Sequence, residues 1–188
     1  MTGRVFRLHS TLELPLEDVE SYFEDDPAYP SGIETVEITR RNNTLILKAV
    51  AADESLSKYT PTAQLKASVT ETRVYEEEPP RAANGPRWGE EEEEEIPSEL
   101  VEFACFKGDR ETVLQNSALQ YPMFEVLREL AIRSEKGTLT AITENDDGEL
   151  VATRIVEGEA RPASVEVVEN PQEQQGSVNW RDNKFISE

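Results

Sequence analysis

The chain has 188 residues, and its 39 Asp or Glu against 19 Lys or Arg give a formal net charge of −20 at pH 7. Hydrophobic residues make up 37% of the chain, and because they cluster with clear periodicity, the composition excludes a wholly disordered protein. This length suits one ordinary domain or two small ones.

Several protein classes are excluded by simple counts. The single cysteine, Cys105, rules out an intrachain disulfide, and its apolar neighbours predict a buried structural thiol. No stretch approaches the 18 apolar residues of a membrane span, and residues 1–10 lack the apolar run of a signal peptide. These features predict a cytoplasmic protein with no membrane partner.

The excess of acidic residues has two alternative explanations: the protein binds a basic partner, or it works in a cytoplasm rich in salt. Salt screens the self-repulsion that such an excess of carboxylates creates. Because the acids are spread over nearly every predicted surface, the pattern favours the salt-rich cytoplasm. In that case the acidity says little about partners.

The first part of the chain predicts one helix among strands. Alternating hydrophobic residues predict a strand over residues 4–14, and Pro15 opens a helix at a position where proline is tolerated. Asn42-Asn43 predicts a hairpin turn between two strands, since Asn tolerates positive φ. A further strand is predicted over residues 64–76.

The second part repeats this order of elements. A strand is predicted over residues 99–107 and a helical region over 110–134, which Pro122 must break or restart. Strands over 138–143, 149–156 and 163–168 follow, the first two joined by a turn at Asp146-Asp147-Gly148.

The sequence therefore predicts an α+β fold of two β-α-β-β-β units with mainly antiparallel sheets and helices on one face. The units cover residues 1–78 and 98–169, joined by an acidic linker or loop over 79–97 with six consecutive glutamates, and residues 170–188 form a polar tail. A pseudo-duplication and a coincidence of common motifs both remain open, as do two domains or one pseudo-symmetric sheet.

Motifs for catalysis or cofactors are not found. The chain has no phosphate-binding glycine loop, no nucleophile elbow and no calcium loop. Its one histidine, His9, cannot build a histidine-based metal site, so we predict no catalytic residue, no metal and no cofactor. The question of enzymatic activity stays open, with a non-enzyme favoured.

One segment departs from the acidic background. Residues 38–70 carry five Lys or Arg and two Asp or Glu, and Tyr59 lies among them. Such a basic island is either covered by the rest of the protein or binds a phosphate backbone or an acidic protein. The candidate binding residues are Arg40, Arg41, Lys48, Lys58, Tyr59 and Lys66.

The polar tail carries three large hydrophobic residues, Trp180, Phe185 and Ile186. They either fold back onto the protein or form a short docking peptide for another protein.

Three segments resemble the uncharacterised acidic proteins of halophilic archaea. They are LHSTLELPLEDVE at 8–20, the run from Arg40 to Thr70, and QYPMFEVLRELA at 120–131. No activity is assigned to such proteins, so the resemblance implies no catalytic residue, only a cytoplasm with high salt.

Three functions follow as hypotheses. The first is a non-catalytic interaction or regulatory protein adapted to high salt, with a protein partner. The second is a nucleic-acid-associated protein that uses the basic island. The third is a small-molecule-binding protein or small enzyme, which requires a pocket between the two units. The oligomeric state is not predicted.

Overall fold

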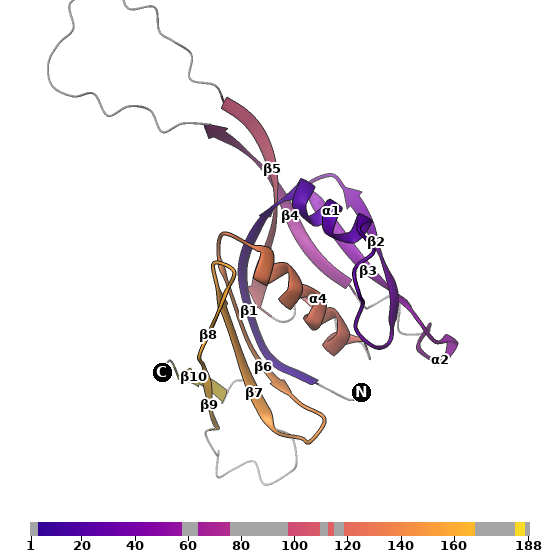
Figure 1. The fold of residues 1–188 in the computed structure, drawn as a ribbon, viewed down its shortest axis with the longest axis vertical. Helices are drawn as coiled ribbons and strands as arrows, with labels where there is room; N and C mark the ends of the chain where they lie inside the picture. The colour runs from indigo at the N-terminus through magenta and orange to yellow at the C-terminus, as the bar shows by residue number, and fades with distance from the viewer. Residues whose placement is uncertain are drawn as a thin grey trace, which may run out of the picture.

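The computed structural model describes residues 4–57, 64–75, 98–109, 113–114, 119–167 and 183–186. In these residues eight antiparallel strands form one sheet in the order β2-β3-β4-β5-β1-β6-β7-β8, and β9 pairs with β10 in a second sheet (Figure 1). The strands of the large sheet are β1 (Arg4–Pro15), β2 (Ile33–Arg41), β3 (Thr44–Ala51), β4 (Gln64–Tyr75), β5 (Ser98–Asp109), β6 (Thr138–Glu144), β7 (Leu150–Val156) and β8 (Glu159–Arg161). The other elements are β9 (Ser164–Val167), β10 (Asn183–Ile186), α1 (Leu16–Glu24), the four-residue α2 (Glu54–Ser57) and α4 (Gln120–Arg133).

The predicted fold of two β-α-β-β-β units is wrong. Strand β1, from the first expected unit, lies between β5 and β6 of the second, so both expected units contribute to one mainly β structure rather than to an α+β pair. The strand expected over 163–168 pairs with β10, and the short β8 takes its place in the large sheet. Local periodicity locates strands, but it does not identify partners that lie about 100 residues away, such as those of β1 and β5.

Helices α1 and α4 each connect two strands that point in the same direction, although neighbouring strands of the sheet are antiparallel. Helix α1 joins β1 to β2, which have three strands between them, and α4 joins β5 to β6, which flank β1. The α1 connection starts from β1 and crosses the sheet toward β2. The α4 connection starts from β5, which is antiparallel to β1, and crosses the sheet the opposite way, toward β6. Because such connections share one hand, both helices are brought to the same face, and the sheet curves around α4 (Figure 1).

Alternation along β1 separates the two faces of the sheet. Leu8, Leu12 and Leu14 are buried beneath the helices, whereas His9 is exposed on the opposite side, here called the helix-free face. The buried side chains of both expected units join one hydrophobic cluster. A single core follows, with side chains from strands β1 to β7.

Helix α4 fills the concave side of the sheet. Pro122 lies in its first turn, where the missing N–H has no intrahelical partner to lose, so the helix begins at Gln120. Phe124, Leu127 and Leu130 are at most 2% exposed and face the sheet. The rest of the predicted helical region, 110–119, lies largely outside the described residues.

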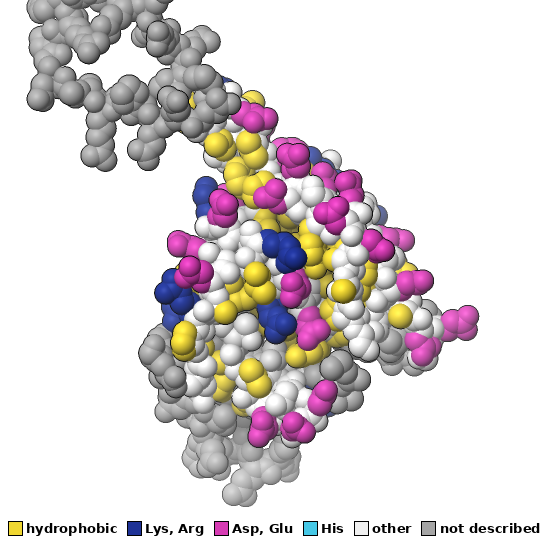
Figure 2. Space-filling view, viewed as in Figure 1, with side chains coloured by type: hydrophobic (Ala, Val, Ile, Leu, Met, Phe, Trp, Pro, Cys, Tyr) yellow, Lys and Arg dark blue, Asp and Glu magenta, His cyan; other side chains and the backbone are white. Residues whose placement is uncertain are grey.

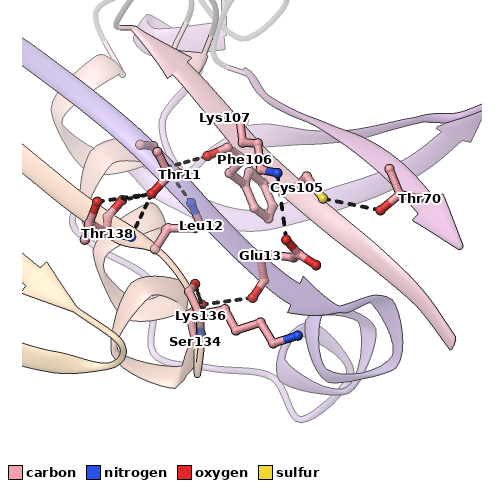
Figure 3. A network of polar contacts seen from close by, with 11 residues as sticks. Thr11, Leu12, Glu13, Thr70, Cys105, Phe106, Lys107, Ser134, Lys136 and Thr138 are labelled. Carbon is pink, nitrogen blue, oxygen red and sulfur yellow. Dashed lines mark hydrogen bonds and ion pairs between the residues drawn. The ribbon is translucent and has the colours of Figure 1, made fainter. Parts of the chain in front are cut away.

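The chain leaves α4 through a tight junction with β1 (Figure 3). The Ser134 hydroxyl donates to the backbone oxygens of Glu13 at 3.0 Å and Lys136 at 2.6 Å. The Thr138 amide donates to the Thr11 hydroxyl oxygen at 2.9 Å. These bonds satisfy the backbone between the helix and β6 and hold it against β1.

Candidate functional site

The basic island lies at one end of the large sheet. Arg40 and Arg41 end the edge strand β2, Lys48 lies on β3 and Lys66 on β4. Lys58 and Tyr59 lie outside the described residues. The structure therefore places four of the six predicted residues on three neighbouring strands.

These four side chains do not share one face. Arg40 points to the helix side of the sheet, where its Nη2 and Nη1 atoms donate to the two carboxylate oxygens of Glu102 at 2.6 and 2.9 Å. By strand alternation Arg41, Lys48 and Lys66 lie on the helix-free face. Among the described residues, these three have no ion-pair partner within 4.0 Å.

The Arg40–Glu102 pair has an electrostatic role on the sheet. Glu71 of β4 lies directly opposite Glu102 of β5, and two carboxylates so placed repel each other. The bidentate bond from Arg40 offsets that repulsion and ties the edge strand to β5. Arg40 is therefore engaged in the fold, unlike Arg41.

We expect the carboxyl group of Glu102 to titrate below the ordinary glutamate range. The hydrogen bond from Arg40 lowers the pKa of Glu102 from its usual value of 4.5. The pair therefore contributes stability above that pH and loses it as the pH falls through the lowered pKa. A carbon NMR titration of Glu102 measures this, and Arg40→Gln should return the pKa to the ordinary range. An unchanged pKa in that variant would show that Arg40 is not the cause.

A second feature is a two-stranded arm that projects from the sheet (Figure 1). It consists of Thr70–Tyr75 of β4 paired with Ser98–Phe103 of β5. Every residue of the β4 part is exposed. Three large hydrophobic side chains are exposed here, Val74 at 41%, Tyr75 at 52% and Leu100 at 55%.

Both outer edges of the arm are unpaired within the described residues. Strand β3 pairs with β4 only as far as Ser68, and β1 pairs with β5 only from Phe103 onward. The Arg73 Nη1 atom donates to the Ser98 hydroxyl at 2.8 Å and fastens the two strands near the tip. Hydrophobic side chains extend along the arm, with acidic side chains beside them (Figure 2).

A third feature is a cleft between the two expected units. It has a volume of about 420 Å³. One wall comes from the α1–β2 segment and the other from α4, with the lining residues Tyr22, Pro27, Ala28, Tyr29, Pro30, Glu125, Val126, Arg128, Glu129 and Arg133. The space-filling surface over α4 shows basic and acidic side chains close together (Figure 2).

Aromatic and charged groups meet in this cleft. The Arg133 guanidinium lies 4.5 Å from the centre of the Tyr22 ring, and its Nη1 atom donates to Glu129 Oε2 at 3.1 Å. Burial raises the pKa of the Tyr22 hydroxyl, and the charge of Arg133 opposes this shift. The tyrosines and prolines suit a planar or apolar ligand group, and the arginines suit an anionic one.

Other predicted residues fall in structural positions. Cys105 is buried on β5, with its Sγ atom 3.5 Å from the Thr70 hydroxyl (Figure 3), as expected of a structural thiol. His9 Nδ1 lies 3.3 Å from Asp109 Oδ1 on the neighbouring strand. Within the described ranges, no three His, Cys, Asp or Glu side chains gather as a metal site would require. None of the helices described has the length and apolar composition needed to cross a bilayer.

The predicted docking tail is described only at its end. Phe185 and Ile186 lie in β10, whose backbone pairs with Val165 and Ser164 of β9. Trp180 lies outside the described residues.

Sequence reasoning missed the arm, and it required a pocket between the two units for its third hypothesis without naming the residues that line the cleft. The strand pattern on both sides of residues 76–97 is the signal of a long hairpin and could have located the arm. Which of its side chains stay uncovered depends on where β1 and β3 stop pairing, and the cleft depends on how α4 faces the α1–β2 segment.

Comparison with known proteins gives one family assignment. A family model matches residues 2–187, and its description is a family of unknown function. No curated protein and no solved structure matches this chain.

Proposed function

This chain belongs to the DUF7110 family, whose function is unknown, and we propose that it is a non-catalytic interaction protein of a high-salt cytoplasm that docks a protein strand on its β4–β5 arm. The observation that carries the proposal is the arm itself, whose strand edges are unpaired within the described residues and lie beside the exposed side chains of Val74, Tyr75 and Leu100. A strand edge with unpaired backbone groups is a template for another strand, and the apolar side chains add contact area.

The expected salt concentration favours this surface over the basic island. At about 1 M salt the Debye length is about 3 Å, so attraction between phosphates and lysines or arginines is strongly screened. Nucleic-acid binding by Arg41, Lys48 and Lys66 would weaken with every increase in salt. Burial of apolar side chains and backbone pairing do not depend on such attraction, and screening relieves the repulsion between a chain of net charge −20 and an acidic partner.

A small-molecule-binding function is the second candidate. It is supported by the cleft between the two expected units, whose volume of about 420 Å³ lies within the range of ordinary ligand pockets. Its lining fits a planar ligand with an anionic group, stacked on Tyr22 or Tyr29 and bound by Arg128. This candidate is compatible with the first, because the cleft lies on α4 and the arm on β4 and β5.

We expect Leu100→Glu to abolish partner capture at high salt. The introduced carboxylate places a charge at the centre of the docking edge, where it would be desolvated on binding. Tagged protein is used to capture partners from an extract of its own cells, and the bound proteins are identified by mass spectrometry. The matched control is Ile132→Glu, because Ile132 is similarly exposed, at 46%, but lies on α4. Equal capture by both variants and the unaltered protein would place the docking surface elsewhere.

A further inference from the structure

We infer that the strand docked on the arm is the β5 edge of a second copy of this chain, paired antiparallel about a two-fold axis at Leu100. This inference rests on the proposed function and names its partner. In the pair, the edge Ser98–Glu102, which has no strand partner among the residues described, lies against the same five residues of the other copy. Two arms then form one four-stranded sheet.

The position of the axis follows from the existing strand pairing and from charge. Phe103 is already paired with Pro15 of β1, so Glu102 is the last residue of β5 that a second copy can reach along this edge. With the axis at Val101, Glu99 would lie opposite Phe103, where β1 already pairs. With the axis at Glu99, the two Glu99 carboxylates would lie opposite each other. An axis at Leu100 avoids both.

The charge pattern of the edge is self-complementary in this register. With Leu100 opposite its own copy, Ser98 lies opposite Glu102 and Glu99 lies opposite Val101. No carboxylate therefore faces a carboxylate directly across the new strand pair. This matters in a chain of net charge −20, because like charges directly opposite each other destabilise a strand pair.

The other edge of the arm, Thr70–Tyr75 of β4, can also pair with itself without like charges opposite each other, for example with Thr72 at the centre and Glu71 opposite Arg73. The choice of the β5 edge therefore rests on Leu100, which at 55% exposure is the most exposed of the large hydrophobic side chains described. A pair centred on Leu100 buries this side chain against its own copy.

Pairing of two copies also stabilises the arm. A two-stranded ribbon alone is only marginally stable in water, whereas a four-stranded sheet buries more of its apolar side chains. In the paired form, the two Leu100 side chains lie on one face beside Arg73, whose cross-strand neighbour is Leu100. The association should strengthen with salt, because screening removes the repulsion between two chains of the same charge.

A charge-swap experiment tests the pairing by light scattering and sedimentation equilibrium. We expect the unaltered protein to be a dimer at molar KCl and to dissociate as the salt is lowered. Leu100→Glu and Leu100→Lys should each weaken the dimer at least tenfold, because each replaces an apolar contact at the axis by two like charges that lose water on pairing. An equimolar mixture of the two variants should recover a dimer that contains one chain of each, since the introduced carboxylate and ammonium then meet in direct contact, where salt screens them much less than exposed charges. Leu100→Ile should keep the dimer, and circular dichroism checks that all variants are folded.

Two results would overturn the inference. One is a protein that stays monomeric over the whole range of salt and concentration. The other is a dimer that survives both charge variants, or a mixture that forms no mixed dimer. Another result is a monomeric protein whose unaltered chain captures a different protein that Leu100→Glu does not capture. In that case the proposed function stands and only the identity of the partner is wrong. If no variant at Leu100 changes any association, both proposals fail.

Discussion

The variant Gly137→Ala should lose about 3–5 kcal/mol of folding free energy, because it combines a strained backbone with an overlap of atoms. Gly137 has a φ of +93°, a region that side chains other than glycine rarely adopt. A Cβ atom there would lie 2.1 Å from the backbone oxygen of Thr11 and 2.7 Å from its carbonyl carbon. Both atoms belong to β1, a central strand, so neither can move without disturbing the sheet. Urea unfolding in molar KCl measures the loss.

The matched control for this variant is Gly148→Ala. Gly148 also has a positive φ, +78°, but the nearest atom to its Cβ would be a carboxylate oxygen of the Glu144 side chain at 3.7 Å. Its substitution should therefore cost only the backbone term, about 1–2 kcal/mol. The difference between the two variants isolates the clash with Thr11. Equal losses would show that β1 does not approach Gly137 as closely as described.

The second large effect is expected for Leu127→Ala, which should destabilise the protein by about 3–5 kcal/mol. Leu127 is fully buried on the face of α4 that packs in the concave side of the sheet. Removing its branched end leaves a cavity among side chains from both halves of the chain, since those halves share one hydrophobic cluster. The whole protein should then unfold in a single transition at lower urea, as followed by far-UV circular dichroism and tyrosine fluorescence.

The control on the same helix is Ile132→Ala. The Ile132 side chain is 46% exposed, so its truncation should change the unfolding free energy by about 0.5 kcal/mol or less. Two separate transitions in Leu127→Ala, with one of them unshifted, would contradict a core shared by strands β1 to β7.

Interaction strength as a function of salt separates the hypotheses for this protein. Binding of a nucleic acid by Arg41, Lys48 and Lys66 would fall as salt rises, because it releases counterions. Association through the arm would rise, because its apolar contacts remain while charge repulsion is screened. One titration with KCl thus distinguishes the basic island from the arm as the functional surface.

Features of the local backbone could be predicted from the sequence. Pro15 ends β1 and precedes α1, as the tolerance of proline at a helix start predicts. Asn42 takes a φ of +52° at the turn between β2 and β3, as the Asn42-Asn43 pair predicts. Pro122 lies in the first turn of α4, so the prediction that a helix starts there is confirmed within two residues. Each of these features depends on residues next to one another in the chain.

How the strands pair, and which side chains stay exposed, depends on contacts between distant parts of the chain. Nothing near β1 specifies that it lies between β5 and β6, because this pairing is selected by burial of residues about 90 to 140 positions apart. The same pairing separates Arg40, which binds Glu102, from Arg41 on the opposite face, although the two are neighbours in sequence. It also ends the contact of β1 with β5 at Phe103, and so leaves Leu100 uncovered at the edge of the arm. Whether a side chain is exposed depends on which strand or helix lies beside it, and this is determined only when the whole sheet has assembled.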